Sequence, residues 1–202
     1  NEMKDIVQFS YGGDGMDGAK VEKQKLLLIG KTHEELTEMY KFEVNEKLSK
    51  VFTKRLFNKI MKNNKKYTTE LETHFSYICK KQTELIEDFY HNSPEDTTFF
   101  PVNLYRLIVN AKNMLKKYSK LSDLDPLYVL ERIDYLKKNL KNSSLDTGNF
   151  MMEVLLDSYL SPKQVIIKHH LNKNSFDYII FSIKTKYFES IIPIGELVGT
   201  IA

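Results

Sequence analysis

Apolar residues recur at the spacing of an α-helix through most of the stretch from residue 33 to residue 192. Side chains three or four positions apart share one face of a helix, and that face can be buried. The periodicity predicts a mainly α fold: a helical domain with short β segments at the two termini. The clearest stripe follows Pro101 and consists of Leu104, Leu107, Ile108, Ala111, Met114, Leu115 and Tyr118, with Arg106, Lys112 and Lys116 expected to reach solvent. Further stripes are Phe75, Ile78, Cys79, Gln82, Leu85, Ile86 and Phe89; Leu127, Leu130, Ile133, Leu136 and Leu140; and Phe176, Ile179, Ile180, Ile183 and Tyr187.

Two sequence signals predict where helices begin. Asp125 followed by Pro126 is typical of an N-cap residue with proline at the first helical position. Ser161 and Pro162 repeat this pattern, and Gln164 stands where a capping-box residue is expected. The polar stretches 142–144 and 146–149 predict loops between helices.

The two ends of the chain differ from this helical middle. Residues 1–29 are expected to be extended at first, because β-branched and aromatic residues precede a glycine-rich turn at 12–18. The last residues, 194–202, form an apolar run with glycines and no helix-stop signal. We interpret the chain as a piece inserted into a larger protein, so that its two ends connect to that protein at one place. Val7 and Phe9 are then expected to lie near Leu197 and Ile201.

Composition narrows the class of protein. The single cysteine, Cys79, excludes an internal disulfide framework and fits a reducing compartment. A formal net charge of +3 does not by itself indicate a nucleic-acid-binding protein. The longest apolar runs, such as 26–29, are too short to span a bilayer, and the N-terminus lacks the apolar core of a signal peptide. We expect an intracellular protein with no membrane contact.

Three motifs resemble one family. Residues 5–18 resemble the Val-Gln-Phe-x-Tyr-Gly-Glu-Asp-Gly-Met-Asp motif of the largest subunit of multisubunit DNA-directed RNA polymerases, closest to eukaryotic RNA polymerase II. Residues 101–111 are similar to its Pro-Val-Asn-x-x-Arg-Ile-Ile-x-Asn-Ala helix start, and residues 194–202 to its Pro-Gly-Glu-x-Val-Gly-x-Ile-Ala motif. Gly13 stands where the family usually has Glu, and Ile194 where it usually has Pro. This divergence, with the Lys/Asn-rich composition, would suit a large cytoplasmic DNA virus.

The resemblance implies a domain organisation and a function. Residues 30–189 are expected to form the helical foot domain, and 1–29 and 190–202 to belong to the cleft region of the parent subunit. The implied function is a non-catalytic scaffold with a docking surface, in a parent nucleotidyltransferase that resembles Mg-dependent polymerases. Implied partners are other polymerase subunits, transcription or mRNA-processing factors, and DNA and RNA through the parent complex. The implied location is the nucleus if the protein is cellular, and the host cytoplasm or virion if it is viral.

Other candidate sites have simpler explanations. Gly13, Gly15 and Gly18 match the spacing of a dinucleotide-binding turn, but Asp14 and Asp17 would then stand beside a pyrophosphate, so a tight turn is the better interpretation. Asp123 and Asp125 are expected to cap a helix, since the family's metal-binding Asn-Ala-Asp-Phe-Asp-Gly-Asp signature is absent. The adjacent His169 and His170 point about 100° apart on a helix and cannot share a metal. We predict no catalytic, cofactor or metal residues in this chain.

The strongest charge feature is the stretch 41–66. It contains nine Lys or Arg residues against Glu43 and Glu46, which gives a net charge of +7. Leu48, Val51, Phe52, Leu56 and Ile60 predict one basic amphipathic helix. A solvated face over a packed stripe is the simpler explanation, and a free-standing helical nucleic-acid-binding protein is the alternative function. The candidate partner surface consists of Lys47, Lys50, Lys54, Arg55 and Lys59.

Overall fold

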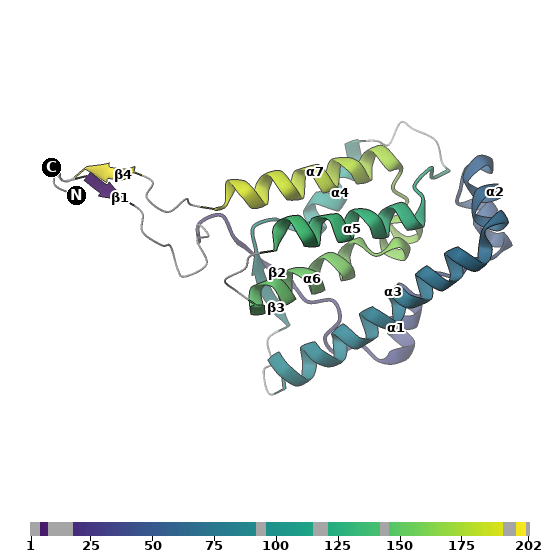
Figure 1. The fold of residues 1–202 in the computed structure, drawn as a ribbon, viewed down its shortest axis with the longest axis horizontal. Helices are drawn as coiled ribbons and strands as arrows, with labels where there is room; N and C mark the ends of the chain where they lie inside the picture. Colours follow the sequence, from purple (N-terminus) through teal and green to yellow (C-terminus); the bar gives the residue numbers. More distant parts are fainter. Residues whose placement is uncertain are drawn as a thin grey trace.

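The computed structural model describes residues 5–7, 18–91, 96–114, 121–141, 146–191 and 197–200. Within these residues the fold is mainly α with short strands, as predicted (Figure 1). The α-helices are α1 (His33–Tyr40), α2 (Lys54–Lys62), α3 (Asn64–Glu84), α4 (Leu104–Met114), α5 (Pro126–Leu140), α6 (Asp146–Leu160) and α7 (Lys173–Glu189). A 3-10 turn, η1 (Glu46–Lys50), and two π-helical turns, η2 (Leu85–Phe89) and η3 (Lys163–Lys168), join them.

The two ends of the chain pair with each other. Strand β1 (Asp5–Val7) runs antiparallel to β4 (Leu197–Thr200), and Val7 lies opposite Leu197. In Figure 1 the two strands lie side by side at one end of the molecule, next to both termini. The predicted proximity of the ends is therefore confirmed for Val7 and Leu197, whereas Phe9 and Ile201 lie outside the described residues.

A second two-stranded sheet lies within the helical body. Strand β2 (Glu22–Lys25) pairs antiparallel with β3 (Thr97–Phe100). The buried side chain of Gln24 donates a hydrogen bond to the carbonyl of Val102 at 2.6 Å and accepts one from the amide of Leu104 at 2.9 Å, so it holds the start of α4. Strand β3 lies inside the range predicted to be helical, and its Thr-Thr-Phe-Phe sequence suits a strand.

Residues of the predicted apolar stripes form part of the core, although Ile86 of the stripe 75–89 is 38% exposed. The stripe of α7 is buried at Phe176, Ile179, Ile180, Ile183 and Tyr187, and that of α4 at Leu104, Leu107, Ile108 and Ala111. Arg106 and Lys112 are exposed as predicted, and Arg106 forms an ion pair with Glu22 of β2. Leu115, Lys116 and Tyr118 lie outside the described residues. Leu26 and Leu28 are buried in the same core. The assignment of 1–29 and 190–202 to a parent subunit stays a prediction.

The helix-start predictions have different outcomes. Asp125 caps α5 as predicted, and its carboxylate accepts a hydrogen bond from the amide of Leu127 at 2.9 Å. A helical turn does begin at Pro162, but the Ser161 hydroxyl is buried and caps nothing, and Gln164 donates instead to the carbonyl of Met39 at 2.9 Å. The predicted capping box is therefore wrong, because tertiary contacts occupy these side chains.

The prediction of a loop at 146–149 is wrong. Asp146 begins α6, and Asn149 is buried within that helix. The other loop, 142–144, lies outside the described residues. No helix in the part of the chain that the structure describes is long and apolar enough to cross a membrane.

Candidate functional site

The predicted partner surface is split between two elements. Lys47 and Lys50 belong to η1, and Lys54, Arg55 and Lys59 belong to α2. All five side chains are exposed. The prediction of one continuous helix through 41–66 is therefore wrong, although the apolar stripe beneath the surface is buried at Leu48, Phe52, Leu56 and Ile60.

The break between η1 and α2 has a tertiary cause. Phe52 forms a parallel bridge with Ser122, in which the Ser122 amide donates to the carbonyl of Val51 at 2.7 Å and the Thr53 amide donates to the carbonyl of Ser122 at 3.0 Å. These bonds use backbone groups that a continuous helix would pair internally. The ring of Phe52 is 1% exposed and stacks near Phe42, with ring centroids 6.4 Å apart. Burying the side chain of Phe52 and pairing its backbone with Ser122 is therefore more favourable than continuing the helix through this residue.

The residue that caps α5, Asp125, also bonds to Lys59 of the candidate partner surface. The Asp125 carboxylate that caps α5 also accepts hydrogen bonds from the ammonium of Lys59 at 2.7 Å and from the hydroxyl of Tyr67 at 2.8 Å. Burial, followed by the contact with Asp125, raises the pKa of Tyr67. Asp125 thus joins the start of α5 to the last turn of α2 and the first turn of α3. Lys59 has a structural partner, whereas Lys47, Lys50, Lys54 and Arg55 form no ion pair within the described residues.

A second polar site lies inside the helical body. A pocket of about 350 Å³ is lined by α3, α5 and α6. In it the ammonium of Lys137 lies 2.7 Å from Oδ1 of Asp157, which is 1% exposed, and 4.7 Å from the ring centre of Tyr77. The Tyr77 hydroxyl donates to Glu153 at 3.2 Å. One carboxylate and one ammonium therefore link three helices.

Burial shifts the pKa values of two groups in this pocket, Asp157 and His74. It raises the pKa of Asp157 to about 6, although Lys137 acts in the opposite direction. It lowers the pKa of His74 to about 3, and the neighbouring Lys137 adds to this effect. His74 is therefore neutral at physiological pH. Within the described residues neither Nε2 of His74 nor Oδ2 of Asp157 has a hydrogen-bond partner.

The sequence interpretation missed this pocket. Its signal was the two acids, Glu153 and Asp157, in the otherwise apolar run 150–160, and a buried acid needs a partner that a sequence does not name. Perturbed pKa values occur at functional sites and also in structural ion pairs. Because Asp157 is almost fully buried, we interpret the pair as a structural link between helices rather than as a catalytic group.

The remaining candidates have different outcomes. The expectation that His169 and His170 lie on one helix is wrong, because the helical turn η3 ends at Lys168. Of the glycine-rich turn, only Gly18 belongs to the described residues. Asp123 accepts a hydrogen bond from the amide of Lys173 at 2.8 Å, at the start of α7. His169 follows η3, burial lowers its pKa to about 4, and His170 adopts a left-handed conformation with φ of 54°. Cys79 is partly buried, which raises the pKa of its thiol. The absence of metal and cofactor residues from the whole chain stays a prediction.

Comparison with known proteins agrees with the three motifs. The family described as RNA polymerase Rpb1, domain 6, matches residues 16–190. Two relatives from Trypanosoma brucei brucei, the DNA-directed RNA polymerase II subunits RPB1-A and RPB1-B, are each 24% identical over 230 aligned residues. The alignments include all of this chain and 13% of each relative, so the chain spans about an eighth of the length of these proteins. The mainly α fold, the matched residues and the polymerase motifs lead to one conclusion: the chain belongs to the Rpb1 domain 6 family of RNA polymerase largest subunits.

Proposed function

We propose that this chain is the foot module of a DNA-directed RNA polymerase largest subunit and that it acts as a non-catalytic scaffold. In this proposal the parent enzyme joins ribonucleotides on a DNA template with Mg²⁺, and the foot supplies neither metal ligands nor a nucleophile. The role of the foot is to hold its neighbours in place and to offer an outer surface to other subunits and to transcription or mRNA-processing factors. The parent complex acts in the nucleus of a cell, or in the host cytoplasm and virion if the source is a virus.

The observation that supports the proposal is the pairing of β1 with β4. Residues at opposite ends of the sequence lie opposite each other in an antiparallel ladder, with Asp5 facing Thr200 and Val7 facing Leu197. Facing Cα atoms in such a ladder are about 4.5–5.5 Å apart. A chain that leaves and re-enters at this separation can be inserted into another fold without displacing it, as expected for an appended module.

The same geometry provides the test. A hairpin turn of two to five residues can join two antiparallel strands. In the parent subunit, replacing the segment that corresponds to residues 8–196 of this chain by such a turn should leave an assembled polymerase. That polymerase should extend a primed template at close to the wild-type rate. A deletion that also removes β1 and β4 is the matched control and should impair assembly. If the enzyme with the short turn assembles fully but loses nucleotide addition by about 100-fold or more, the non-catalytic proposal is wrong.

A second candidate function is a free-standing nucleic-acid-binding protein. The observation that favours it is the exposure of Lys47, Lys50, Lys54 and Arg55 without acidic partners in the described structure. The replacement experiment separates the two functions, since a free-standing protein has no parent polymerase into which the short turn could be introduced.

A further inference from the structure

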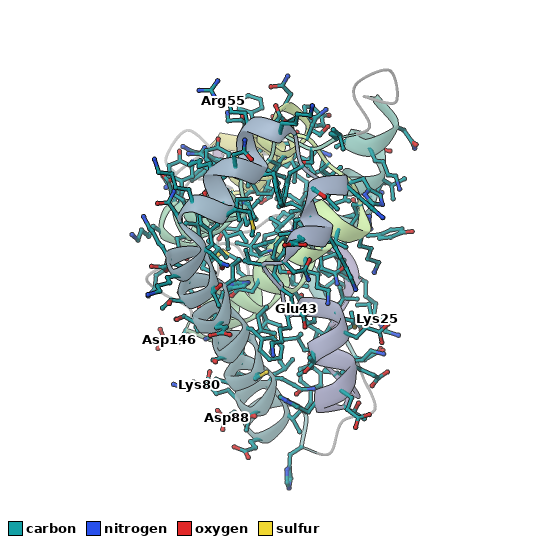
Figure 2. The ribbon with its side chains drawn as sticks, turned by 90° about the vertical axis from the view of Figure 1, so that its right-hand side faces the viewer. Lys25, Glu43, Arg55, Lys80, Asp88 and Asp146 are labelled. Carbon is teal, nitrogen blue, oxygen red and sulfur yellow. The ribbon has the colours of Figure 1, made fainter. Side chains whose placement is uncertain are left out.

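The stretch from residue 47 to residue 69 contains eight Lys or Arg residues and no Asp or Glu. It covers most of η1, all of α2 and the first turns of α3. We name its exposed cations the basic corner: Lys47, Lys50, Lys54, Arg55, Lys62, Lys65 and Lys66. Figure 1 places α2 at the end of the helical body away from the C-terminal end of α7, and Figure 2, which views this end, shows Arg55 at the edge of the molecule.

The charges of the basic corner are not neutralised by ion pairs within the described residues. Lys59 is the cation of this stretch that has an acidic partner, Asp125, and it is therefore left out of the corner. The seven others form no ion pair with any residue that the structure describes. A surface of one sign without internal partners attracts polyanions and raises their local concentration.

The surface between these cations indicates which polyanion fits. Five large apolar residues of the stretch, Leu48, Phe52, Leu56, Ile60 and Tyr67, are buried, and Val51, Phe57 and Met61 are partly buried. The exposed large hydrophobic side chains of the described structure all lie elsewhere, such as Phe99, Tyr105 and Phe181. A protein interface usually has an apolar or aromatic centre surrounded by polar groups. Binding to a phosphate backbone requires only cations, so the basic corner fits nucleic acid better than an acidic protein.

The dimensions also agree with a phosphate backbone. Lys54 and Lys62 stand eight residues apart on α2, which corresponds to about 12 Å along the helix axis. Each strand of a DNA duplex carries one phosphate per about 3.4 Å of its axis, so α2 spans three to four phosphates. Without an exposed aromatic side chain the corner lacks a platform for base stacking, and recognition is therefore independent of sequence.

We propose that the basic corner binds the sugar–phosphate backbone of nucleic acid. This extends the docking surface of the proposed function but does not depend on insertion into a parent subunit. The assay is fluorescence anisotropy of a labelled 20-nucleotide RNA strand, and of a DNA duplex of the same length, with the full chain at several salt concentrations. If about five cations contact phosphates, raising salt from 50 to 200 mM should weaken RNA binding roughly 100-fold, at a slope of about 0.7 per contact. The slope for the duplex is expected to be steeper, about 0.9 per contact, and the dissociation constants at equal salt show which form the corner prefers.

The decisive comparison uses two triple variants of equal net charge. Lys54→Gln/Arg55→Gln/Lys62→Gln removes three cations of the corner and should lower the salt slope for RNA by about 2. The control, Lys23→Gln/Lys138→Gln/Lys186→Gln, removes three exposed lysines from β2, α5 and α7 and should leave the slope unchanged. Circular dichroism melts confirm that both variants are folded. All six substituted side chains are exposed, so neither variant opens the core.

Two outcomes would overturn the proposal. Equal loss of affinity in the two variants means that total charge decides binding and that the corner is no site. Tighter binding of a poly-glutamate peptide than of RNA with the same number of charges means that the corner is a site for an acidic protein. Neither outcome bears on the replacement of residues 8–196, so failure of this proposal and failure of the foot assignment are distinguishable.

Discussion

The buried ion pair between Lys137 and Asp157 makes a sharp prediction about stability. Replacing Lys137 by Met leaves a carboxylate that is 1% exposed without its cation. Removing one partner of a buried pair typically costs about 3–5 kcal/mol, because the remaining charge is uncompensated. We expect Lys137→Met to lower the free energy of unfolding by this amount at pH 7.5.

The raised pKa of Asp157 determines how its contribution to stability changes with pH. The folded pKa of Asp157, about 6, lies above its usual value of 3.8, so the folded state binds more protons than the unfolded state between these values. The contribution of Asp157 to stability is therefore greatest below pH 3.8 and is lost as pH rises through about 6. At 1.36 kcal/mol per pH unit the loss amounts to about 3 kcal/mol. Without Lys137 the pKa of Asp157 rises further, so the cost of Lys137→Met should shrink below pH 6, where the carboxyl group is protonated.

Removal of the acid and removal of the cation should lower the free energy of unfolding by different amounts. In Asp157→Leu the ammonium of Lys137 keeps the carboxylate of Asp134, 3.9 Å away, and the Tyr77 ring. This variant should therefore lose less stability than Lys137→Met. The double variant Lys137→Met/Asp157→Leu removes both charges and should lie within about 1 kcal/mol of wild type or above it, since apolar replacement of a buried pair is often neutral or stabilising.

The assay is urea unfolding followed by circular dichroism at pH 7.5 and pH 5.0. Each variant is compared with wild type at the same pH. Two results would refute the reasoning: a Lys137→Met variant that loses less than about 1 kcal/mol at pH 7.5, or a double variant as unstable as that single variant. Either result would mean that the pair is not desolvated as the structure indicates.

Three further predictions concern single positions. Leu107→Ala should cost about 2–5 kcal/mol, because Leu107 is 5% exposed in the core, and a thermal melt identical to wild type would contradict its placement. Asp125→Ala should cost about 1 kcal/mol or more in urea unfolding, since it removes the α5 cap and the acceptor shared by Lys59 and Tyr67. His74 has a folded pKa of about 3, below its usual 6.5, so its contribution to stability is present above pH 6.5 and falls as pH drops. A His74→Leu variant should lose less stability than wild type between pH 6.5 and pH 5, and equal losses would show that His74 is not buried as a neutral group.

The sequence by itself determined the features that depend on local spacing. The stripes of α4 and α7 are buried at the residues that helical periodicity selects, because a 3.6-residue repeat fixes which side chains share a face. The Asp125 cap is likewise local, since its acceptor and the amide of Leu127 are two residues apart. The pairing of Val7 with Leu197 followed from the end motifs, whose family resemblance carries long-range information that composition lacks.

Tertiary structure decided the features that require a distant partner. The helix predicted through 41–66 breaks at Phe52 because Ser122, seventy positions away, pairs with its backbone. Ser161 has the local pattern of a cap, yet packing buries its hydroxyl, and Gln164 bonds to Met39 instead of the helix end. Asp157 needed a cation, and only the packing of α5 against α6 supplies Lys137. Periodicity is a property of neighbouring residues, whereas the partner of a buried polar group depends on which helices pack together, and the free energy of that packing exceeds the preference of any single local signal.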